Sequence, residues 1–277
     1  CVANQGALST LLLEITPPTT AAGVGGVRFL QLARNLTRTN EDYEIDLPRV
    51  STVHGFVNTK GCASAINGTL PVMVTLTPGE QSYGLPTVSY VATTELVPVS
   101  DACQAQFGAG VGSVQEFTVN VPAGSYDVYV QPSAAATSSA DAGSPSAGCS
   151  LVPELFRGRT VPVGDSCLSL PVNSPKEVDV DLPWSEAATS LAGWTLRIVH
   201  PVTGALLSDV AVLHGAPAAT QSGTGYTSVL HYSPIGAGDS AQPGQELLRL
   251  SPQPGTLGPT IQLELSGLEA LSSTRRA

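Results

Sequence analysis

Three of the four histidines, His200, His214 and His231, each stand at the end of an apolar run that has the length of a β-strand. Imidazole nitrogens are common zinc ligands, so three such side chains at one place would bind a metal ion. Consecutive antiparallel strands end at opposite edges of a sheet, which would bring His200 and His231 together but leave His214 at the other edge. We therefore expect ordinary strand-end histidines, with no metal and no other cofactor.

One stretch could supply a nucleophilic serine. Gly164-Asp165-Ser166-Cys167-Leu168 resembles the Gly-Asp-Ser block of some serine hydrolases. Such an enzyme needs its serine at a strand-to-helix turn or in an oxyanion loop, with a histidine placed beside it. No helical pattern follows Ser166, and Cys167 is a candidate for a disulfide. The sequence therefore predicts a structural loop here and no enzyme activity.

Three carboxylates, Glu177, Asp179 and Asp181, alternate along one predicted strand and therefore share one face of it. Carboxylate oxygens are ligands that Ca²⁺ prefers. A solvated outer face of a sheet explains the same alternation without a bound ion, and we expect that simpler arrangement.

One group of aromatic side chains could stack on a sugar ring. Its members are Trp184, Trp194, Tyr226 and Tyr232. Aromatic residues make up only 5% of the chain, so a stacking platform is poorly supplied. We keep these four as tentative binding residues, with carbohydrate as the alternative partner.

Five cysteines occur, and Cys1 stands apart from the others at the first position. None has the Cys-x-x-Cys spacing that is typical of a zinc site. The other four are disulfide candidates, because such a composition usually accompanies an oxidising compartment. They allow three pairings, and closeness in the sequence favours Cys62–Cys103 and Cys149–Cys167. Four free, buried thiols are the alternative.

The first residues, Cys1-Val2-Ala3-Asn4-Gln5-Gly6, resemble the mature start of a bacterial lipoprotein, whose signal peptide is cut just before a lipid-modified cysteine. The resemblance implies a diacylglycerol on the Cys1 thiol and acylation of its amine, and several acyl chains anchor a protein stably. Val2 is not the aspartate that retains enterobacterial lipoproteins at the inner membrane. The resemblance therefore implies the outer membrane, at its periplasmic or extracellular face. A chain that starts at an arbitrary cysteine is the alternative.

The 277 residues carry a formal net charge of −10, and only 12% of them are charged. A negative net charge argues against nucleic acid as a partner and against electrostatic binding to anionic lipid. Hydrophobic residues make up 42%, enough to bury a core. No apolar run reaches the length of about 18 residues that a membrane-spanning helix needs.

The clearest strand pattern is the stretch 116–132. Apolar residues alternate with polar ones in two runs, at Phe117, Val119 and Val121 and then at Tyr126, Val128 and Val130. This is the period of a β-strand, and Pro122-Ala123-Gly124 between the runs favours a turn, so we expect a β-hairpin. Gly124 is expected to adopt a backbone conformation closed to other residues. Tyr126 is expected to bury its ring and bond its hydroxyl to nearby backbone.

Short runs of this kind recur along the chain between many of its 28 glycines and 22 prolines, which predicts an all-β protein. The segment 134–149, rich in Ala and Ser, has no residues that could form a core, so we expect a flexible linker there. One long loop within a single domain is the alternative. The predicted organisation is a tether over 1–7, β-sandwiches over 8–133 and 150–271 joined by the linker, and a frayed tail over 272–277.

Motifs in both halves point to one family. They are Val53-His54-Gly55-Phe56-Val57, Pro71-Val72-Met73-Val74-Thr75-Leu76, the Val-Pro-x-Gly-x-Tyr motif of 121–126, and 194–212 with its turn Thr203-Gly204-Ala205-Leu206-Leu207. They resemble the carboxypeptidase regulatory-like domain, a transthyretin-like (prealbumin-like) β-sandwich. The resemblance implies two tandem Greek-key sandwiches of transthyretin-like type. Because these motifs are structural, it implies no activity.

These features together predict a non-enzymatic outer-membrane lipoprotein that serves as a structural or protein-binding module in a cell-envelope assembly. Open sheet edges of sandwiches pair readily with strands of partner proteins. The expected partners are the membrane, through Cys1, and other envelope proteins. The alternative is a carbohydrate-binding or adhesion lipoprotein at the cell surface.

Overall fold

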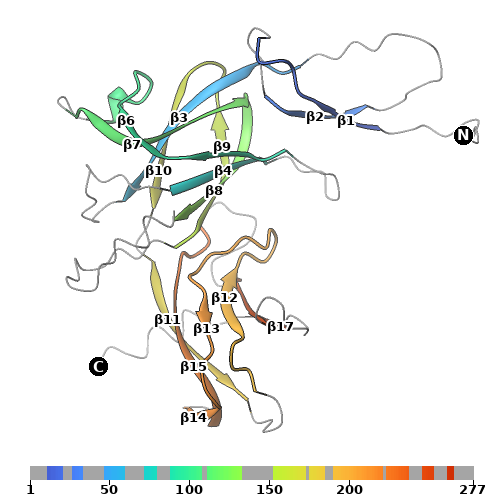
Figure 1. Ribbon diagram of the computed structural model, residues 1–277, viewed down its shortest axis with the longest axis vertical. Coiled ribbons are helices and arrows are strands. Elements are labelled where there is room, and N and C mark those ends of the chain that lie inside the picture. Colours follow the sequence, from blue (N-terminus) through green and yellow to red (C-terminus); the bar gives the residue numbers. More distant parts are fainter. Residues whose placement is uncertain are drawn as a thin grey trace, which may run out of the picture.

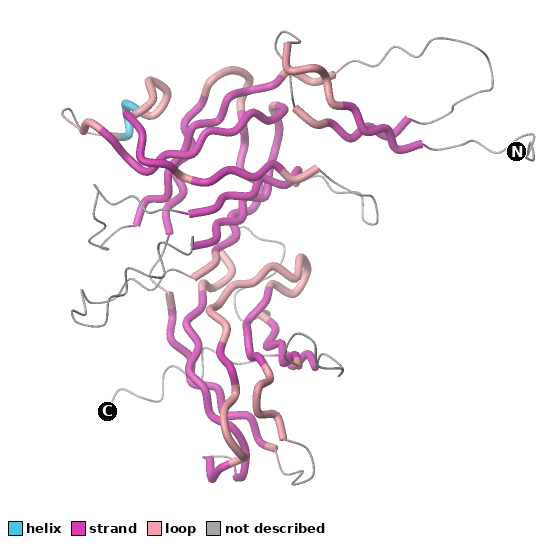
Figure 2. The backbone as a smooth tube through the Cα atoms, in the orientation of Figure 1, coloured by secondary structure: helices cyan, strands magenta, loops and turns pink. Residues whose placement is uncertain are grey.

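In the computed structural model of the protein, the described residues are 11–20, 27–33, 47–59, 72–79, 88–107, 111–132, 152–172, 175–184, 190–220, 223–236, 245–252 and 261–264. Within them the regular secondary structure is almost entirely β-strand, in mostly antiparallel sheets, which confirms the predicted all-β class (Figure 1). Their only helical element is the short 3-10 helix η1 (Gln104–Gln106), coloured cyan in Figure 2. No helix of these segments is long and apolar enough to cross a membrane. The predicted tether, linker and tail lie outside the described residues.

Two four-stranded sheets pack face to face as the first sandwich (Figure 1). One sheet has the strand order β10-β3-β7-β6, and the other has the order β5-β4-β8-β9. The strand bounds are β3 (Val50–Thr59), β4 (Val72–Pro78), β5 (Tyr90–Thr93), β6 (Glu95–Pro98), β7 (Ser113–Pro122), β8 (Gly124–Pro132), β9 (Glu154–Val161) and β10 (Ser166–Val172). Neighbouring strands are antiparallel except for β10 and β3, which are parallel.

The core of the first sandwich comes from alternate residues of these strands, as the two-residue period requires. One sheet contributes Val53, Val57, Phe117, Val121, Leu170 and Val172. The other contributes Val72, Val74, Leu76, Tyr126, Val128, Val130, Phe156 and Val161. Gly55 makes room for the Phe117 ring, because a Cβ at this position would meet that ring and lie 2.7 Å from the Leu168 carbonyl oxygen.

The stretch 116–132 does not form the predicted β-hairpin. β7 pairs with β3 and β6, whereas β8 pairs with β4 and β9, so the chain passes from one sheet to the other at the end of β7. The two apolar faces cover each other across the core instead of lying side by side. Gly124 is the first residue of β8 and has no positive φ, so its predicted special conformation is also wrong. Tyr126 behaves as predicted: it is 3% exposed, and its hydroxyl donates to the Pro122 carbonyl oxygen at 2.6 Å.

β9 and β10 belong to the first sandwich, although the sequence prediction assigned them to the second domain. β9 extends the sheet beyond β8, and β10 lies beside β3 in the other sheet. Ser51 holds the turn between them, since its hydroxyl donates to the Pro162 carbonyl oxygen at 2.7 Å and accepts the Gly164 N–H at 3.2 Å. The first core therefore ends after Val172. The sequence prediction placed the domain boundary at 134–149 because that segment has no residues that could form a core. Such a segment can also join two strands of one sheet, and β8 and β9 on either side of it do pair.

The second sandwich packs a three-stranded sheet, β11-β15-β14, against a four-stranded sheet, β13-β12-β16-β17, with antiparallel pairing throughout. The strand bounds are β11 (Lys176–Pro183), β12 (Thr195–Val199), β13 (Ala211–Val212), β14 (Ala218–Thr220), β15 (Gly223–Tyr232), β16 (Leu247–Ser251) and β17 (Ile261–Glu264). Its buried core includes Val178, Val180, Leu182, Leu196, Ile198, Leu207, Leu230, Leu248 and Leu250.

The two sandwiches are in contact with each other. The Tyr129 hydroxyl, on β8, donates to the Leu206 carbonyl oxygen of the second sandwich at 2.9 Å. Leu155, on β9, packs against the second core. Because only 173–175 separate β10 from β11, a short link and these contacts join the two units.

A two-stranded sheet precedes both sandwiches. It consists of β1 (Leu11–Ile15) and β2 (Phe29–Ala33), which pair antiparallel. The Tyr90 hydroxyl, on β5, donates to the Arg28 carbonyl oxygen at 2.8 Å and so connects this sheet to the first sandwich.

Candidate functional site

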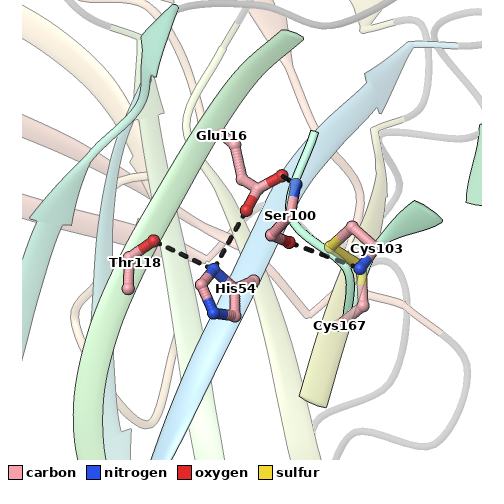
Figure 3. The surroundings of a disulfide bond; sticks show 6 residues. All are labelled: His54, Ser100, Cys103, Glu116, Thr118 and Cys167. Carbon is pink, nitrogen blue, oxygen red and sulfur yellow. Dashed lines mark hydrogen bonds and ion pairs between the residues drawn. A yellow bond between two sulfur atoms is a disulfide. The ribbon is translucent and has the colours of Figure 1, made fainter. Parts of the chain in front are cut away.

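The disulfide of the described residues joins Cys103 to Cys167, which are 64 residues apart in sequence. Disulfide bonding of these two cysteines is confirmed, but both predicted pairings, Cys62–Cys103 and Cys149–Cys167, are wrong. Cys167 lies on β10 beside β3, and Cys103 lies in the segment 99–107 that folds over the same sheet (Figure 3). Closeness in sequence is a poor guide here, because the sheets bring distant strands together. Cys1, Cys62 and Cys149 lie outside the described residues.

A histidine–glutamate pair lies next to this disulfide (Figure 3). His54, on β3, places Nδ1 3.0 Å from Oε1 of Glu116 and 3.1 Å from Oγ1 of Thr118, both on β7. The Glu116 side chain is 1% exposed, while that of His54 is 21% exposed. A buried carboxylate needs hydrogen-bond donors, and the imidazole is one of them.

The second donor to Glu116 comes from the segment 99–107, here called the covering loop. The backbone N–H of Ser100 donates to Oε2 of Glu116 at 3.2 Å, and the hydroxyl of Ser100 accepts the N–H of Cys103 at 3.3 Å. At the far end of the loop, the Phe107 ring lies 4.5 Å from that of Phe56. The covering loop is therefore held on the outer face of the sheet by a disulfide, a carboxylate and a ring contact.

This cluster brings together side chains of β3, β7, β10 and the covering loop that are far apart in the sequence. Both oxygens of Glu116 and Nδ1 of His54 are occupied by partners within the cluster. The arrangement positions the covering loop on the sheet. Sequence reasoning missed His54 and Glu116, although both stand at polar positions of alternating runs.

The three histidines considered as metal ligands lie in separate surroundings, and His214, after β13, is exposed. His200 is 1% exposed, and its Nδ1 accepts the N–H groups of Val202 and Thr203, each at 3.2 Å, in the turn after β12. His231 places Nδ1 3.0 Å from Oδ2 of Asp209. His200 follows β12 and His231 lies within β15, a strand of the other sheet, so the expectation that they share an edge is wrong. The described residues contain no cluster of His, Cys, Asp or Glu suited to a metal ion.

Ser166 is the first residue of β10, opposite Val53 in parallel register, and a strand rather than a helix follows it. Gly164 before it has φ 97°, a left-handed conformation that favours glycine. The Gly164-Asp165-Ser166 stretch thus turns the chain between two strands.

The four tentative aromatic binding residues surround one core instead of forming an exposed platform. Tyr226 and Tyr232 are buried, at 4% and 5% exposure, and the hydroxyl of Tyr226 accepts the N–H of Leu191 at 3.0 Å. Trp184 and Trp194 are partly buried against the same core. The prediction of a stacking surface is therefore wrong for the tyrosines, because their alternating positions on β15 face inward.

Three tyrosines of the first sandwich have perturbed hydroxyl groups. Burial raises the pKa of Tyr90 and of Tyr129 to about 12. Burial also raises the pKa of Tyr126, and the neighbouring Tyr90 adds to this effect. The Tyr90 and Tyr126 rings meet edge to face, with centroids 6.2 Å apart. The Tyr90 and Tyr126 rings thus pack against each other in the first sandwich, and Tyr129 bonds to the second sandwich.

The predicted row of carboxylates lies on the face of β11 that points away from the core. Glu177 is opposite His231 on β15, with 3.8 Å between its carboxylate and the imidazole Nε2. The Glu177 side chain is 67% exposed, and Asp179 is also exposed. β11 has a paired neighbour on one side only among the described strands.

No model of a known protein family matches this chain, and no curated protein is found to be similar to it. The function is therefore inferred from the fold and from these contacts.

Proposed function

We propose that this chain is a non-enzymatic, protein-binding module of a bacterial cell envelope, anchored in the outer membrane through a lipid on Cys1. Its two sandwiches are assigned to the Greek-key, transthyretin-like type. The corner between β7 and β8 supports this type, because Tyr126 bonds there to backbone four residues earlier, as the Val-Pro-x-Gly-x-Tyr motif implies.

The observation that carries the binding role is the exposure of apolar side chains on edge strands. Val91 on β5 is 57% exposed and Leu96 on β6 is 54% exposed, and each strand is outermost in its sheet. Val212 on β13, another outermost strand, is 41% exposed. An edge strand offers backbone N–H and C=O groups to a partner strand, and apolar side chains beside them add to the contact.

Carbohydrate binding is the weaker role. It depends on Trp184, Trp194, Tyr226 and Tyr232, of which the two tyrosines are buried in the second core. A ring that is already packed in a core has no face left for a sugar.

Photo-crosslinking in the intact envelope tests the protein-binding role. A photoreactive amino acid replaces Val91, Leu96 or Val212, and Val163 serves as the matched control. Val163 is 62% exposed but lies in the turn between β9 and β10. We expect one identifiable envelope protein to be linked from the edge positions and not from Val163. Equal linking from Val163, or no linked protein, contradicts the proposal.

The lipid anchor has its own test. Replacement of Cys1 by Ser should abolish labelling by radioactive palmitate and move the protein from the membrane fraction to the soluble fraction, because the acyl chains are lost. Unchanged labelling and fractionation would contradict the anchor without bearing on the protein-binding role.

A further inference from the structure

The covering loop begins directly after β6, the four-residue edge strand that carries the exposed Leu96. The start of β6 is fixed to the other sheet, because the Thr94 N–H donates to the Val72 carbonyl oxygen at 2.9 Å and the Thr94 hydroxyl accepts the Val72 N–H at 2.8 Å. Beyond the end of β6, Ser100 of the loop donates to Glu116 on β7. The covering loop therefore determines how firmly the end of this edge strand is held.

The non-covalent contacts of the loop have opposite effects on its closure. The Phe107 ring packs against Phe56, which is 3% exposed, and burial of these rings favours the closed loop. Glu116 has the opposite effect, since its side chain is 1% exposed and a carboxylate is more stable in water than when it is buried. Opening of the loop would return this carboxylate to water. The bond between Cys103 and Cys167 is the covalent link that keeps the loop closed (Figure 3).

Solvent reaches this disulfide from one of its two ends. Cys103 is 0% exposed, whereas Cys167 is partly exposed on β10, which is outermost in its sheet among the described strands. An incoming thiolate therefore attacks the sulfur of Cys167, and Cys103 on the loop is the leaving group. This direction of attack separates the loop from the sheet and leaves the reductant on the sheet.

We propose that the Cys103–Cys167 disulfide is a redox switch that controls the order of the covering loop and of β6, and that hydration of Glu116 favours the open loop. In the oxidised protein the loop is closed and the β6 edge is ordered. In the reduced protein the loop opens and the end of β6 separates from β7. The consequence for partner binding at Leu96 rests on the proposed protein-binding function: the reduced protein binds there more weakly, because a mobile edge must become ordered on binding.

The reductant is a dithiol, and the exchange takes two steps. In the first, one thiolate sulfur of the dithiol bonds to Sγ of Cys167 as the disulfide breaks, and Cys103 leaves as a thiolate that takes up a proton from water. In the second, the other thiolate of the dithiol bonds to the first sulfur and releases Cys167 as a thiolate. Two electrons pass from the dithiol to the protein, and the dithiol becomes a disulfide.

Hydrogen exchange of the full chain, with and without dithiothreitol, tests the switch. We expect reduction to speed exchange at the amides of Ser100, Cys103 and Phe107 and at those of β6 by at least about tenfold, because loss of a disulfide typically shifts an opening equilibrium by more than this factor. The amides of Val74 and Val130, in the core of the other sheet, should not change. Unchanged exchange in the loop, or an equal increase in the other sheet, would overturn the inference.

Variants attribute the effect to this disulfide and to the buried carboxylate. Cys103→Ala/Cys167→Ala should exchange like the reduced protein, and dithiothreitol should not change its loop further, which excludes the other cysteines as the cause. Glu116→Gln keeps the shape of the side chain and removes its charge, so reduction should open the loop less than in the natural protein. The matched control is Glu95→Gln, at an exposed position of β6, which should respond as the natural protein does. The same response in both glutamine variants would overturn the inference.

Photo-crosslinking separates this inference from the proposed function. A photoreactive amino acid at Leu96 is compared with one at Val212, each in the natural protein and in the Cys103→Ala/Cys167→Ala variant. We expect linking from Leu96 to fall about tenfold in the variant, because apparent affinity falls with the fraction of molecules whose edge is ordered, while linking from Val212 stays the same. Equal linking from Leu96 in both proteins refutes this inference alone. A loop that opens on reduction, together with no linked protein at either position, refutes the proposed function alone.

Discussion

Tyr126 joins the two sheets of the first sandwich at a single residue. Its ring belongs to the core, and its hydroxyl donates to the carbonyl oxygen of Pro122 on the strand of the other sheet. The side chain therefore provides both packing area and a hydrogen bond where the chain changes sheets.

Replacement of Tyr126 by Ala should lower the free energy of unfolding by about 2–4 kcal/mol, because a large buried side chain is removed. Tyr126→Phe keeps the ring and removes only the bond to Pro122, so it should cost about 1 kcal/mol. Chemical denaturation of both variants measures the difference. Equal stability of the Ala variant and the natural protein would show that the ring does not hold the corner.

Stability should also fall at alkaline pH. The pKa of Tyr90 and of Tyr129 is raised to about 12 in the folded protein, against an ordinary value of about 10 in the unfolded chain. The unfolded chain releases these protons first, so their contribution is complete below about pH 10 and is lost as pH rises toward about 12. Denaturation at several pH values, with Tyr129→Phe as a control, measures the fall. A constant unfolding free energy across this range would contradict the burial of these hydroxyls.

At the scale of elements, the covering loop is fixed to a sheet with which it forms no strand pair. Cys103 is bonded to Cys167 on β10, and Ser100 donates to Glu116 on β7. His54 on β3 completes the contact, so three strands of one sheet share in holding the loop (Figure 3). The loop in turn keeps the carboxylate of Glu116 away from water.

The double replacement Cys103→Ala/Cys167→Ala should lower the free energy of unfolding by about 2–4 kcal/mol, the usual contribution of a disulfide. It should also increase hydrogen exchange at the Ser100 amide, because the loop then remains attached only through Glu116 and the Phe56–Phe107 contact. Denaturation and exchange measurements on the variant test both effects. Slow exchange at Ser100 in the variant would mean that the disulfide does not hold the loop.

At the scale of the whole molecule, the first sandwich is completed by strands that follow the segment 134–149. β9 and β10 form the outer edges of its two sheets and contribute Phe156, Val161, Leu170 and Val172 to its core. Contacts through Tyr129 and Leu155 then bring the second sandwich against the first.

A fragment of residues 1–149 should therefore fail to fold, because it lacks two of the eight strands and the Cys167 half of the disulfide. A fragment of residues 1–174 contains the complete first core and should fold cooperatively. Circular dichroism and thermal unfolding of the two fragments compare them directly. Cooperative unfolding of the shorter fragment would place the boundary where the composition change suggested.

The sequence by itself determined the all-β class of the protein and which faces of the strands are buried. Alternation at a period of two is a local property, so it predicted strands, the buried row on β11 and the inward ring of Tyr126. The same pattern could not reveal the role of His54 or Glu116, because polar residues on an outer face look alike until a loop covers some of them.

Only the tertiary structure decided which strands pair and which cysteines meet. Two apolar runs joined by a turn can lie side by side in one sheet or face each other across a core, and both arrangements bury the same residues. That ambiguity made β7 and β8 look like a hairpin, placed β9 and β10 in the wrong domain, and favoured disulfides between neighbours in sequence. The disulfide of Cys103, the hydrogen bonds to the Glu116 carboxylate and the bond from Tyr129 to Leu206 are all long-range in the chain, and long-range contacts are set by the packing of whole sheets.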